Sequence, residues 1–355
     1  MIYYEADFIP VGTSEKGGDA AAVRVWDDNG AQLVFVIDGG TKDSGKALVS
    51  HIQTHYRTST VNAAISTHPD GDHSSGLVEV LENLQVQNLF MHQPWDHAVN
   101  IKHLFENSAL THLGLQRKIR EELQFAHDLK KIADRKGIPI IEPFAGGRYY
   151  EGLMHILGPS IGHYQQMLPH FRSTPDAAAP APLPLSGLLA QLGAKINDAI
   201  EFVAETMAVE TLTDEGGHFS AENSSSTVVL FTFGEHKLLF TGDADIEALT
   251  QATLYAASQG ISLADLHLLD VPHHGSKHNV GPTILNVIRT KTAHISAPPS
   301  SPKHPAKKVV NAFIRRGSVV QTTQGKGICY RSDNATLRAG WSPAPVLTFS
   351  NLVEA

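Results

Sequence analysis

The chain has 355 residues, of which 42% are hydrophobic and 18% are charged, and its formal net charge at pH 7 is -8. This composition excludes a disordered chain, and the negative charge argues against a protein whose whole surface binds nucleic acid. Cys329 is the sole cysteine, which excludes an internal disulfide and a thiolate-rich zinc site.

The N-terminal part of the chain predicts strands and turns. Its first residues lack the basic start and apolar run of a signal peptide, and no apolar run approaches the roughly 20 residues of a membrane helix, so we expect a cytoplasmic protein without membrane contact. Residues 20–40 contain two β-rich runs around Asp27-Asp28-Asn29-Gly30, which predict a hairpin, and residues 46–56 have helical spacing. "VNAAIS" then predicts a buried strand that leads directly into "THPDGDH", at the carboxyl end of the strand, where loops often carry functional groups.

Two later segments are interpreted as insertions, because the strongest motifs lie on both sides of them. Residues of about 95–136 are charged and helical and predict an added helical hairpin. Their apolar residues fall at helical intervals: Leu115, Ile119, Leu123, Leu129 and Ile132. Residues of about 160–218 are Ala/Pro-rich and predict irregular structure, which could shape a lid or a surface for a protein partner. We therefore expect a single domain over residues 1–335 and a C-terminal tail over residues 336–355.

Strand ends in the second half of the chain repeatedly deliver His or Asp. "LLFTGDAD" places Asp243 after a predicted strand, "LLDVPHHGS" places His273 and His274 after the next, and "TAHISAPPS" leads to His304. Residues 281–331 also carry nine Lys or Arg and no Asp or Glu. This basic segment could face an anion, or it could be a solvated face or a patch that pairs with acidic residues elsewhere.

A metal site explains the "THPDGDH" stretch better than a solvent-exposed polar loop or a cap for the following helix. Imidazole and carboxylate groups are ligands of zinc and manganese, and a divalent cation compensates the cost of burying several polar groups together. Gly71 lets the backbone turn so that non-adjacent side chains converge. The polar groups in question are His68, Asp70, Asp72 and His73.

The stretch resembles the metallo-β-lactamase superfamily signature His-x-His-x-Asp-His, in the His-x-Asp-x-Asp-His variant of the nuclease-like domain of ComEC-type competence proteins. "GGDAAAVRV", "VIDGG", "LGPS", "NSSSTVVLF", "LLFTGDAD", "VPHHGS" and "KHP" resemble further motifs of that branch, in the same order, over roughly residues 7–332. The resemblance implies an α/β fold, the four-layer αββα sandwich, with two mixed sheets face to face, helices outside, and the helical and Ala/Pro-rich insertions added.

The resemblance further implies two divalent metal ions. Zn²⁺ is expected first, and Mn²⁺ is the alternative because the ligand set is rich in carboxylates. His68 and Asp70 would bind the first ion, and Asp243 would bridge both ions. Many members place another histidine about twenty residues before the bridging aspartate, where this chain has Asn223, so we expect the first ion to be held more weakly.

The second ion would be bound by Asp72, His73 and one histidine of "HHGS". His273 is the preferred ligand because it ends the predicted strand. His274 is the reserve ligand and otherwise supports the centre or contacts phosphate.

The implied function is a binuclear metal-dependent hydrolase, a phosphodiesterase or nuclease acting on DNA, RNA or a small nucleotide. A divalent ion lowers the pKa of bound water from about 15.7 toward roughly 7, and Asp72 could orient that water. His304 would bind phosphate or protonate the leaving group. Further substrate contacts are expected from Asn223, Ser276, Lys277 and Lys303. The alternatives are a lactone, ester or amide hydrolase at the same metals, and a non-catalytic metal-stabilised protein that binds a partner through the inserted helices.

Overall fold

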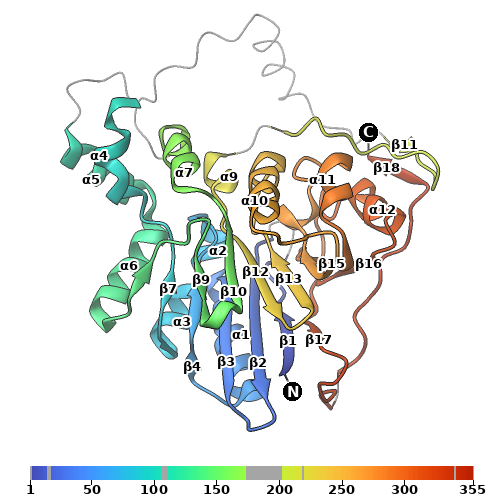
Figure 1. Ribbon diagram of the computed structural model, residues 1–355, viewed down its shortest axis with the longest axis horizontal. Coiled ribbons are helices and arrows are strands. Elements are labelled where there is room, and N and C mark those ends of the chain that lie inside the picture. Colours follow the sequence, from blue (N-terminus) through green and yellow to red (C-terminus); the bar gives the residue numbers. More distant parts are fainter. Residues whose placement is uncertain are drawn as a thin grey trace, which may run out of the picture.

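Two seven-stranded mixed sheets face each other, and helices cover the outer face of each sheet (Figure 1). The computed structural model describes residues 2–13, 17–104, 111–172, 202–217, 220–339 and 341–354. The predicted four-layer αββα sandwich is therefore confirmed. Most of the predicted Ala/Pro-rich insertion, residues 173–201, lies outside the described residues.

The first sheet comes mainly from the N-terminal half of the chain. In spatial order its strands are β17 (Ile328–Arg331), β1 (Ile2–Phe8), β2 (Ala20–Asp27), β3 (Gln32–Gly39), β5 (Ala63–Ile65), β7 (Leu89–Phe90) and β8 (Ile140–Ile141). The strands from β17 to β3 pair antiparallel, and those from β3 to β8 pair parallel. The predicted hairpin is β2–β3, and its turn is closed by the Asp27 amide, 3.1 Å from the Ala31 carbonyl oxygen.

The second sheet comes mainly from the C-terminal half and repeats this arrangement. Its strands are β16 (Val319–Thr322), β15 (Thr290–Ile295), β14 (Leu266–Asp270), β13 (His236–Phe240), β12 (Val228–Phe233), β10 (Met154–Gly158) and β9 (Arg148–Tyr149). Pairing is antiparallel from β9 to β13 and parallel from β13 to β16. Ligand sites of open α/β sheets lie at the carboxyl ends of such parallel strands.

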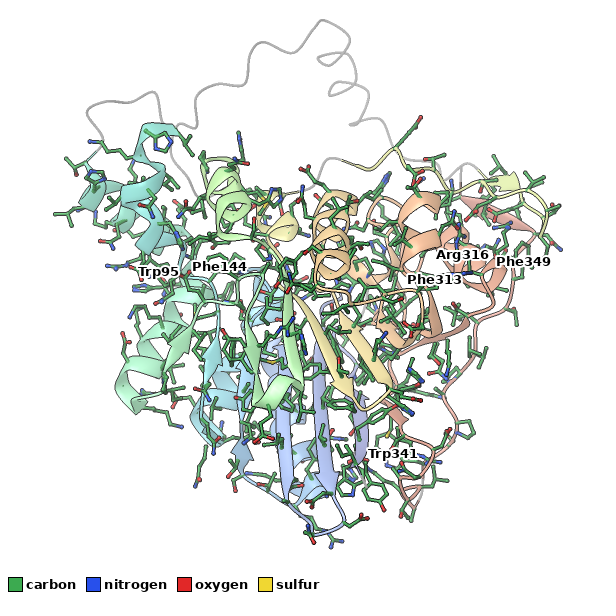
Figure 2. The ribbon with its side chains drawn as sticks, viewed as in Figure 1. Trp95, Phe144, Phe313, Arg316, Trp341 and Phe349 are labelled. Carbon is green, nitrogen blue, oxygen red and sulfur yellow. The ribbon has the colours of Figure 1, made fainter. Side chains whose placement is uncertain are left out.

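The predicted helical insertion is present as a set of helices on one side of the molecule (Figure 1). It comprises η2 (Pro94–His97), α4 (Ala98–Ile101), η3 (Lys102–Leu104), α5 (His112–Glu122) and α6 (Gln124–Lys136). All five apolar residues that predicted it are buried, and Trp95 of η2 is fully buried (Figure 2). The spacing of apolar residues therefore predicted both the helices and their buried faces.

The remaining helices cover the two sheets or are short helical turns within the loops at the ends of the strands. They are α1 (Lys42–His51), η1 (Ile52–Tyr56), α2 (Gly71–Ser74), α3 (Leu77–Asn83), η4 (Tyr150–Gly152), α7 (Ile161–Met167), η5 (Leu168–His170), α9 (Ala221–Ser224), α10 (Ile246–Ser258), η6 (Pro272–Gly275), α11 (Pro282–Val287) and α12 (Lys307–Arg315). Within the described ranges, none of the helices has the length and apolarity needed to cross a membrane.

The core between the two sheets is rich in aromatic rings. The ring of Phe231 lies 5.0 Å from that of Phe35 in the opposite sheet and 5.7 Å from that of Phe240, perpendicular to it. All three side chains are fully buried, and such packed aromatic pairs add to the free energy of apolar burial. This rigid centre fixes the two sheets relative to each other, and with them the loops at their shared edge.

The C-terminal tail is part of the folded structure. Its last strand, β18 (Leu352–Glu354), pairs with β11 (Phe202–Ala204), while β4 (Thr60–Val61) pairs with β6 (Gln85–Val86). Arg338 of the tail donates to both carboxylate oxygens of Asp7, at 3.0 and 2.6 Å, and lies 2.6 Å from the Glu5 carboxylate. Both acidic side chains are buried, so Arg338 supplies the charge that they need.

Arg338→Gln should therefore lower the free energy of unfolding by about 3–5 kcal/mol, because it leaves buried carboxylates without their cation. Urea denaturation measures this loss, and Arg148→Gln, at an exposed arginine, is the control. Burial alone raises the pKa of Asp7, but His51 and Arg338 lower it to about 2. The stabilisation is therefore complete above about pH 4 and is lost as the pH falls toward 2. Equal stability of the two variants would contradict this role.

Candidate metal centre

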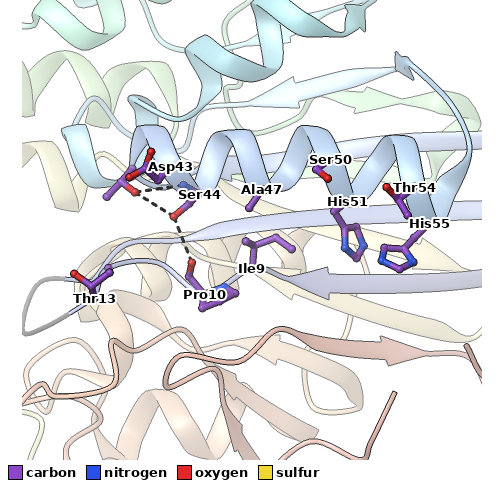
Figure 3. A pocket seen from close by; sticks show the side chains of 12 residues that line it. Ile9, Pro10, Thr13, Asp43, Ser44, Ala47, Ser50, His51, Thr54 and His55 are labelled. Carbon is purple, nitrogen blue, oxygen red and sulfur yellow. Dashed lines mark hydrogen bonds between the residues drawn. The ribbon is translucent and has the colours of Figure 1, made fainter. Parts of the chain in front are cut away.

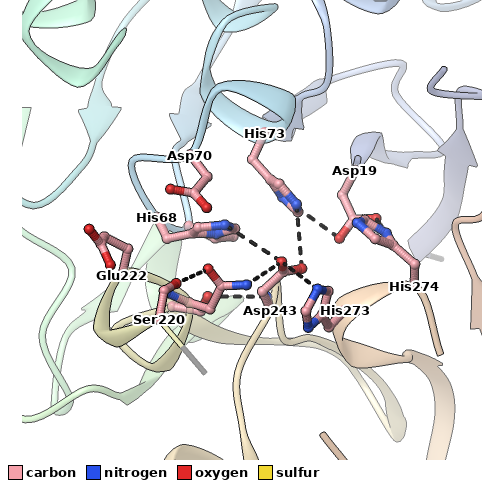
Figure 4. A network of polar contacts seen from close by, with 12 residues as sticks. Asp19, His68, Asp70, His73, Ser220, Glu222, Asp243, His273 and His274 are labelled. Carbon is pink, nitrogen blue, oxygen red and sulfur yellow. Dashed lines mark hydrogen bonds and ion pairs between the residues drawn. The ribbon is translucent and has the colours of Figure 1, made fainter. Parts of the chain in front are cut away.

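Loops from both sheets bring histidine and aspartate side chains together at the shared edge. Asp38 lies at the end of β3, the "HPDGDH" loop follows β5, and Asp243 follows β13. Figure 4 shows Asp243 between the rings of His68, His73 and His273. Residues that are far apart in the sequence thus form a single cluster in space.

Asp243 is the centre of this cluster. Its Oδ1 atom lies 3.4 Å from Nε2 of His73, and its Oδ2 atom lies 3.8 Å from Nε2 of His68 and 3.7 Å from Nε2 of His273. The two carboxylate oxygens therefore face different histidines. This arrangement suits a carboxylate that bridges two cations.

A second carboxylate, that of Asp19, faces the other side of the cluster. It lies 3.4 Å from Nδ1 of His274 and 3.8 Å from Nδ1 of His73. His274 belongs to two sets of donor atoms that could each hold one ion, because the atoms of each set lie within 4.8 Å of one another. The first set is Asp72, His73 and His274, and the second is Asp19, Asp243 and His274. The residues of the expected second metal site therefore assemble with His274.

Two residues orient the central histidines. The carboxylate of Asp38 lies 2.9 Å from Nδ1 of His73 and accepts hydrogen bonds from the amide and hydroxyl of Thr67, at 2.8 and 2.6 Å. The Thr67 hydroxyl also lies 2.9 Å from Nδ1 of His68. Both histidines thus have Nδ1 engaged and Nε2 directed at Asp243, which is how protein groups usually orient metal-binding histidines.

The "HHGS" turn has a strained backbone. His273 and His274 have φ values of 49° and 57°, in the left-handed region that non-glycine residues rarely adopt. Asn279 holds the first of them, because its Oδ1 atom lies 3.0 Å from Nδ1 of His273 while its amide donates to the carbonyl oxygens of Asp243 and Ala244. Such strain is typical of functional sites.

The carboxylates favour positive charge at the centre. Burial alone lowers the pKa of His73, but Asp243, Asp38 and Asp19 raise it well above its usual value. Burial and the neighbouring His73 lower the pKa of His68. A metal ligand must be a neutral imidazole, so an ion that binds here takes the place of the proton on His73.

The residues fit a metal centre on a second, independent ground. Several of their buried polar atoms have no hydrogen-bond partner, which is costly unless a ligand satisfies them. These atoms are Nε2 of His68, Nε2 of His73, Oδ1 of Asp243 and Nδ1 of His274. All four belong to imidazole or carboxylate groups around one cluster, and such groups are zinc ligands.

A close backbone approach leaves no room for a side chain beside the metal loop. A Cβ atom on Gly18 would lie 2.0 Å from the carbonyl oxygen of Asp72. Glycine at this position therefore lets the Asp19 segment lie directly against the "HPDGDH" loop.

The expected ligands differ in their surroundings. His68, Asp72, His73 and Asp243 lie in the cluster, whereas Asp70 contacts Arg172. His274, the reserve ligand, joins the Asp72 and His73 set, while His273 faces Asp243 and is 29% exposed.

The expected substrate-contacting residues lie at different depths. Asn223 donates to Oδ2 of Asp243 at 2.9 Å, and Ser276 is buried. The ring of His304 lies 5.8 Å from that of His273 and 6.2 Å from that of His274. Burial, together with these two histidines, lowers the pKa of His304 to about 4. Lys303 is exposed beside it.

Three residues that the motifs did not identify also belong to the centre. Asp19 directly precedes β2, and Asp38 lies at the end of β3. Their motifs, "GGDAAAVRV" and "VIDGG", were used only as signs of the family. Asn279 follows the "HHGS" turn. An acidic residue at a strand end, as in "VIDGG", was an available signal. Thr67 stands inside the quoted "THPDGDH" stretch but was not assigned a role there, and Arg172 lies outside every motif, so only the fold places it beside Asp70.

Two arginines of the predicted basic segment pair with acidic residues elsewhere. Arg315 lies 2.7 Å from the Glu205 carboxylate, and Arg316 lies 2.7 Å from the Glu210 carboxylate. The alternative of pairing with distant acidic residues is therefore correct for these two arginines. A positive rim at the centre depends on Lys303 and its neighbours instead.

A hollow of about 740 Å³ runs along α1 (Figure 3). It is lined by residues such as Ile9, Ser44 and His51 and contains none of the expected ligands. The Ser44 hydroxyl in it already donates to the Pro10 carbonyl oxygen, at 3.3 Å. The candidate metal centre is therefore separate from this hollow and is marked by the unpartnered imidazole and carboxylate atoms.

Comparison with known proteins identifies the family of the chain. The family model of the metallo-beta-lactamase superfamily matches residues 18–296, which include every expected metal ligand. The chain therefore belongs to this superfamily, whose members are generally metal-dependent hydrolases.

One curated relative shares part of the sequence. The chain is 32% identical to Recombination protein 2 of Haemophilus influenzae over 108 residues, which are 30% of this chain and 13% of that protein. This likeness agrees with the predicted resemblance to ComEC-type proteins. The chain spans only a small part of that relative's length.

Two solved structures are similar to the chain at low identity. A CmlA β-hydroxylase mutant is 12% identical with a TM-score of 0.43, over 92% of this chain and 54% of that one. The long form of RNase Z from yeast is 13% identical with a TM-score of 0.35, over 83% of this chain and 37% of that one.

Asp38→Asn should weaken Zn²⁺ binding by about 10–100-fold, because an amide has one acceptor oxygen and cannot accept both from the Thr67 backbone amide and from Nδ1–H of His73. Competition with a chromophoric chelator measures the affinity. Asp43→Asn, at an exposed aspartate of α1, should bind Zn²⁺ like the unmodified protein. Unchanged affinity in Asp38→Asn would show that other contacts orient His73.

Proposed function

We propose that the chain is a binuclear metal-dependent hydrolase that cleaves phosphodiester bonds in DNA, RNA or a small nucleotide. The observation that carries the proposal is the convergence of buried, unpartnered imidazole and carboxylate atoms around Asp243. The first ion would be held by His68 and Asp70, and Asp243 would lie between the two ions.

The second ion would be held by Asp72 and His73 together with His274. The preference for His274 over His273 is a revision of the sequence-based expectation, and it rests on the set of donor atoms that includes His274. Zn²⁺ is the first candidate and Mn²⁺ the second, since both accept nitrogen and carboxylate ligands.

Bound divalent ions would supply Lewis acidity, which brings the pKa of water toward about 7 and stabilises charge on phosphate oxygens. Asp72 would orient the attacking water by accepting a hydrogen bond from it. His304 would contact a phosphate oxygen or protonate the leaving group. Asn223, Ser276, Lys277 and Lys303 remain proposed substrate contacts.

Two features support a phosphodiester over a lactone, an ester or an amide. The proposed ligand set contains several carboxylates, which suits harder ions, and Lys303 lies beside His304 at the rim. A cytoplasmic location is likewise a proposal, supported by the single cysteine of the sequence.

The protein reconstituted with Zn²⁺ or Mn²⁺ should hydrolyse bis-p-nitrophenyl phosphate, and Asp72→Ala should lower kcat by at least about 10²-fold, because it removes a proposed ligand of the second ion together with the group that orients the water. Release of p-nitrophenolate measures the rate, and Asp43→Ala is the control. Turnover of an activated ester or lactam alone would favour the alternative hydrolase. Absence of any turnover, with lower stability in Asp243→Ala, would favour the metal-stabilised binding protein.

His304→Ala separates the two roles proposed for this histidine. If His304 protonates the leaving group, the variant should lose about 10²–10⁴-fold on a dinucleotide, whose leaving alkoxide is strongly basic, and far less on bis-p-nitrophenyl phosphate. If His304 binds phosphate, both substrates should lose equally, mainly through KM. Steady-state kinetics on the two substrates distinguish these results, and unchanged kinetics on both would exclude either role.

A further inference from the structure

Arg172 binds the carboxylate of Asp70, one of the two side chains expected to hold the first metal ion. Its Nη2 atom lies 2.7 Å from Oδ1 and 2.7 Å from Oδ2 of Asp70. Arg172 follows η5, outside every motif of the family resemblance. An arginine thus reaches the centre from the edge of the second insertion.

The position of this guanidinium nitrogen is the one that a chelating metal ion would take. A cation midway between two carboxylate oxygens interacts with both, as in bidentate carboxylate ligation. Within the described residues, Asp70 joins none of the sets of donor atoms that could hold an ion, whereas His68, Asp72 and His73 each do. Asp70 is therefore committed to Arg172 and does not join the imidazole cluster.

Glu222 holds Arg172 from the other side. Its Oε1 atom accepts a hydrogen bond from the backbone amide of Arg172 at 2.7 Å and lies 3.4 Å from the Nε atom. Glu222 is 1% exposed, while the side chain of Arg172 is 64% exposed. A buried carboxylate therefore anchors the arginine, but its outer end can move away from Asp70 without disturbing the core.

Asn223 does not replace Asp70 as a ligand of the first ion. Its amide nitrogen donates to Oδ2 of Asp243 at 2.9 Å, and its side-chain oxygen accepts a hydrogen bond from the Ser220 hydroxyl. Asn223 thus presents a donor to the centre, where a metal ion needs a lone pair. With Asp70 paired to Arg172, the first ion has His68 and the shared Asp243 as its remaining nearby ligands.

We propose that Arg172 competes with the first metal ion for Asp70, so that the centre fills in two unequal steps. The ion of Asp72, His73 and His274 binds first, and the ion of His68 and Asp70 binds only when it displaces the guanidinium. This inference rests on the metal centre of the proposed function and not on its substrate.

Titration of the metal-free protein with Zn²⁺ alone, against a chromophoric chelator, tests the proposal without any assay of activity. The unmodified protein should bind one equivalent tightly and a second at least about 10-fold more weakly. Arg172→Gln should tighten the second step at least about 10-fold, because Asp70 becomes free for the ion. Asp70→Asn should remove that step both alone and in combination with Arg172→Gln.

Arg135→Gln is the matched control. Arg135 lies on the inserted helix α6, its side chain is 60% exposed like that of Arg172, and it forms an ion pair with Glu82 of α3. This variant should leave both steps unchanged. Because Arg172→Gln leaves the buried Glu222 without its cation, the double variant Arg172→Gln/Glu222→Gln provides a second test, and the same tightening is expected.

A second step that stays unchanged or weakens without Arg172 would overturn the proposal, and Arg172 would then support Asp70 as a hydrogen-bond partner. Two equally tight steps in the unmodified protein would overturn it as well. Absence of any Zn²⁺ binding would instead overturn the metal centre and with it the proposed function, so the two failures are distinguishable.

Discussion

Buried carboxylates in this fold need positive charge within a few ångström, because an uncompensated ionised group inside a protein is costly. The chain meets this requirement in two places. Asp7 and Glu5 face the guanidinium of Arg338, and Asp243 and Asp19 face histidine rings.

The chemical identity of the positive partner decides what each place can do. A guanidinium never loses its proton in a protein, so Arg338 gives the buried Asp7 and Glu5 carboxylates a permanent positive charge. An imidazole loses its proton readily and then presents a lone pair. Since Nε2 of His68 and of His73 have no hydrogen-bond partner, the second place can exchange a proton for a metal ion. Arg172 adds a fixed cation at the border of that centre.

The strained "HHGS" turn shows why the centre is formed by backbone as well as by side chains. Two successive residues in the left-handed region direct neighbouring rings to different partners, so that His273 faces Asp243 while His274 faces Asp19. Asn279 and Gly18 stabilise this geometry, one by hydrogen bonds and the other by leaving room for the Asp19 segment. A flexible turn would not hold adjacent histidines in distinct positions.

The sequence by itself determined the elements, the family and the membership of the "HPDGDH" loop and Asp243 in one centre, because hydrophobic periodicity and strand-end motifs are local properties of the chain. Only the tertiary structure decided the rest. It brought Asp19 and Asp38 to the histidines, directed His274 instead of His273 toward Asp72, and paired Asp70 with Arg172. These contacts join loops that are far apart in the sequence, and the directions of adjacent side chains depend on backbone torsions that no local pattern specifies.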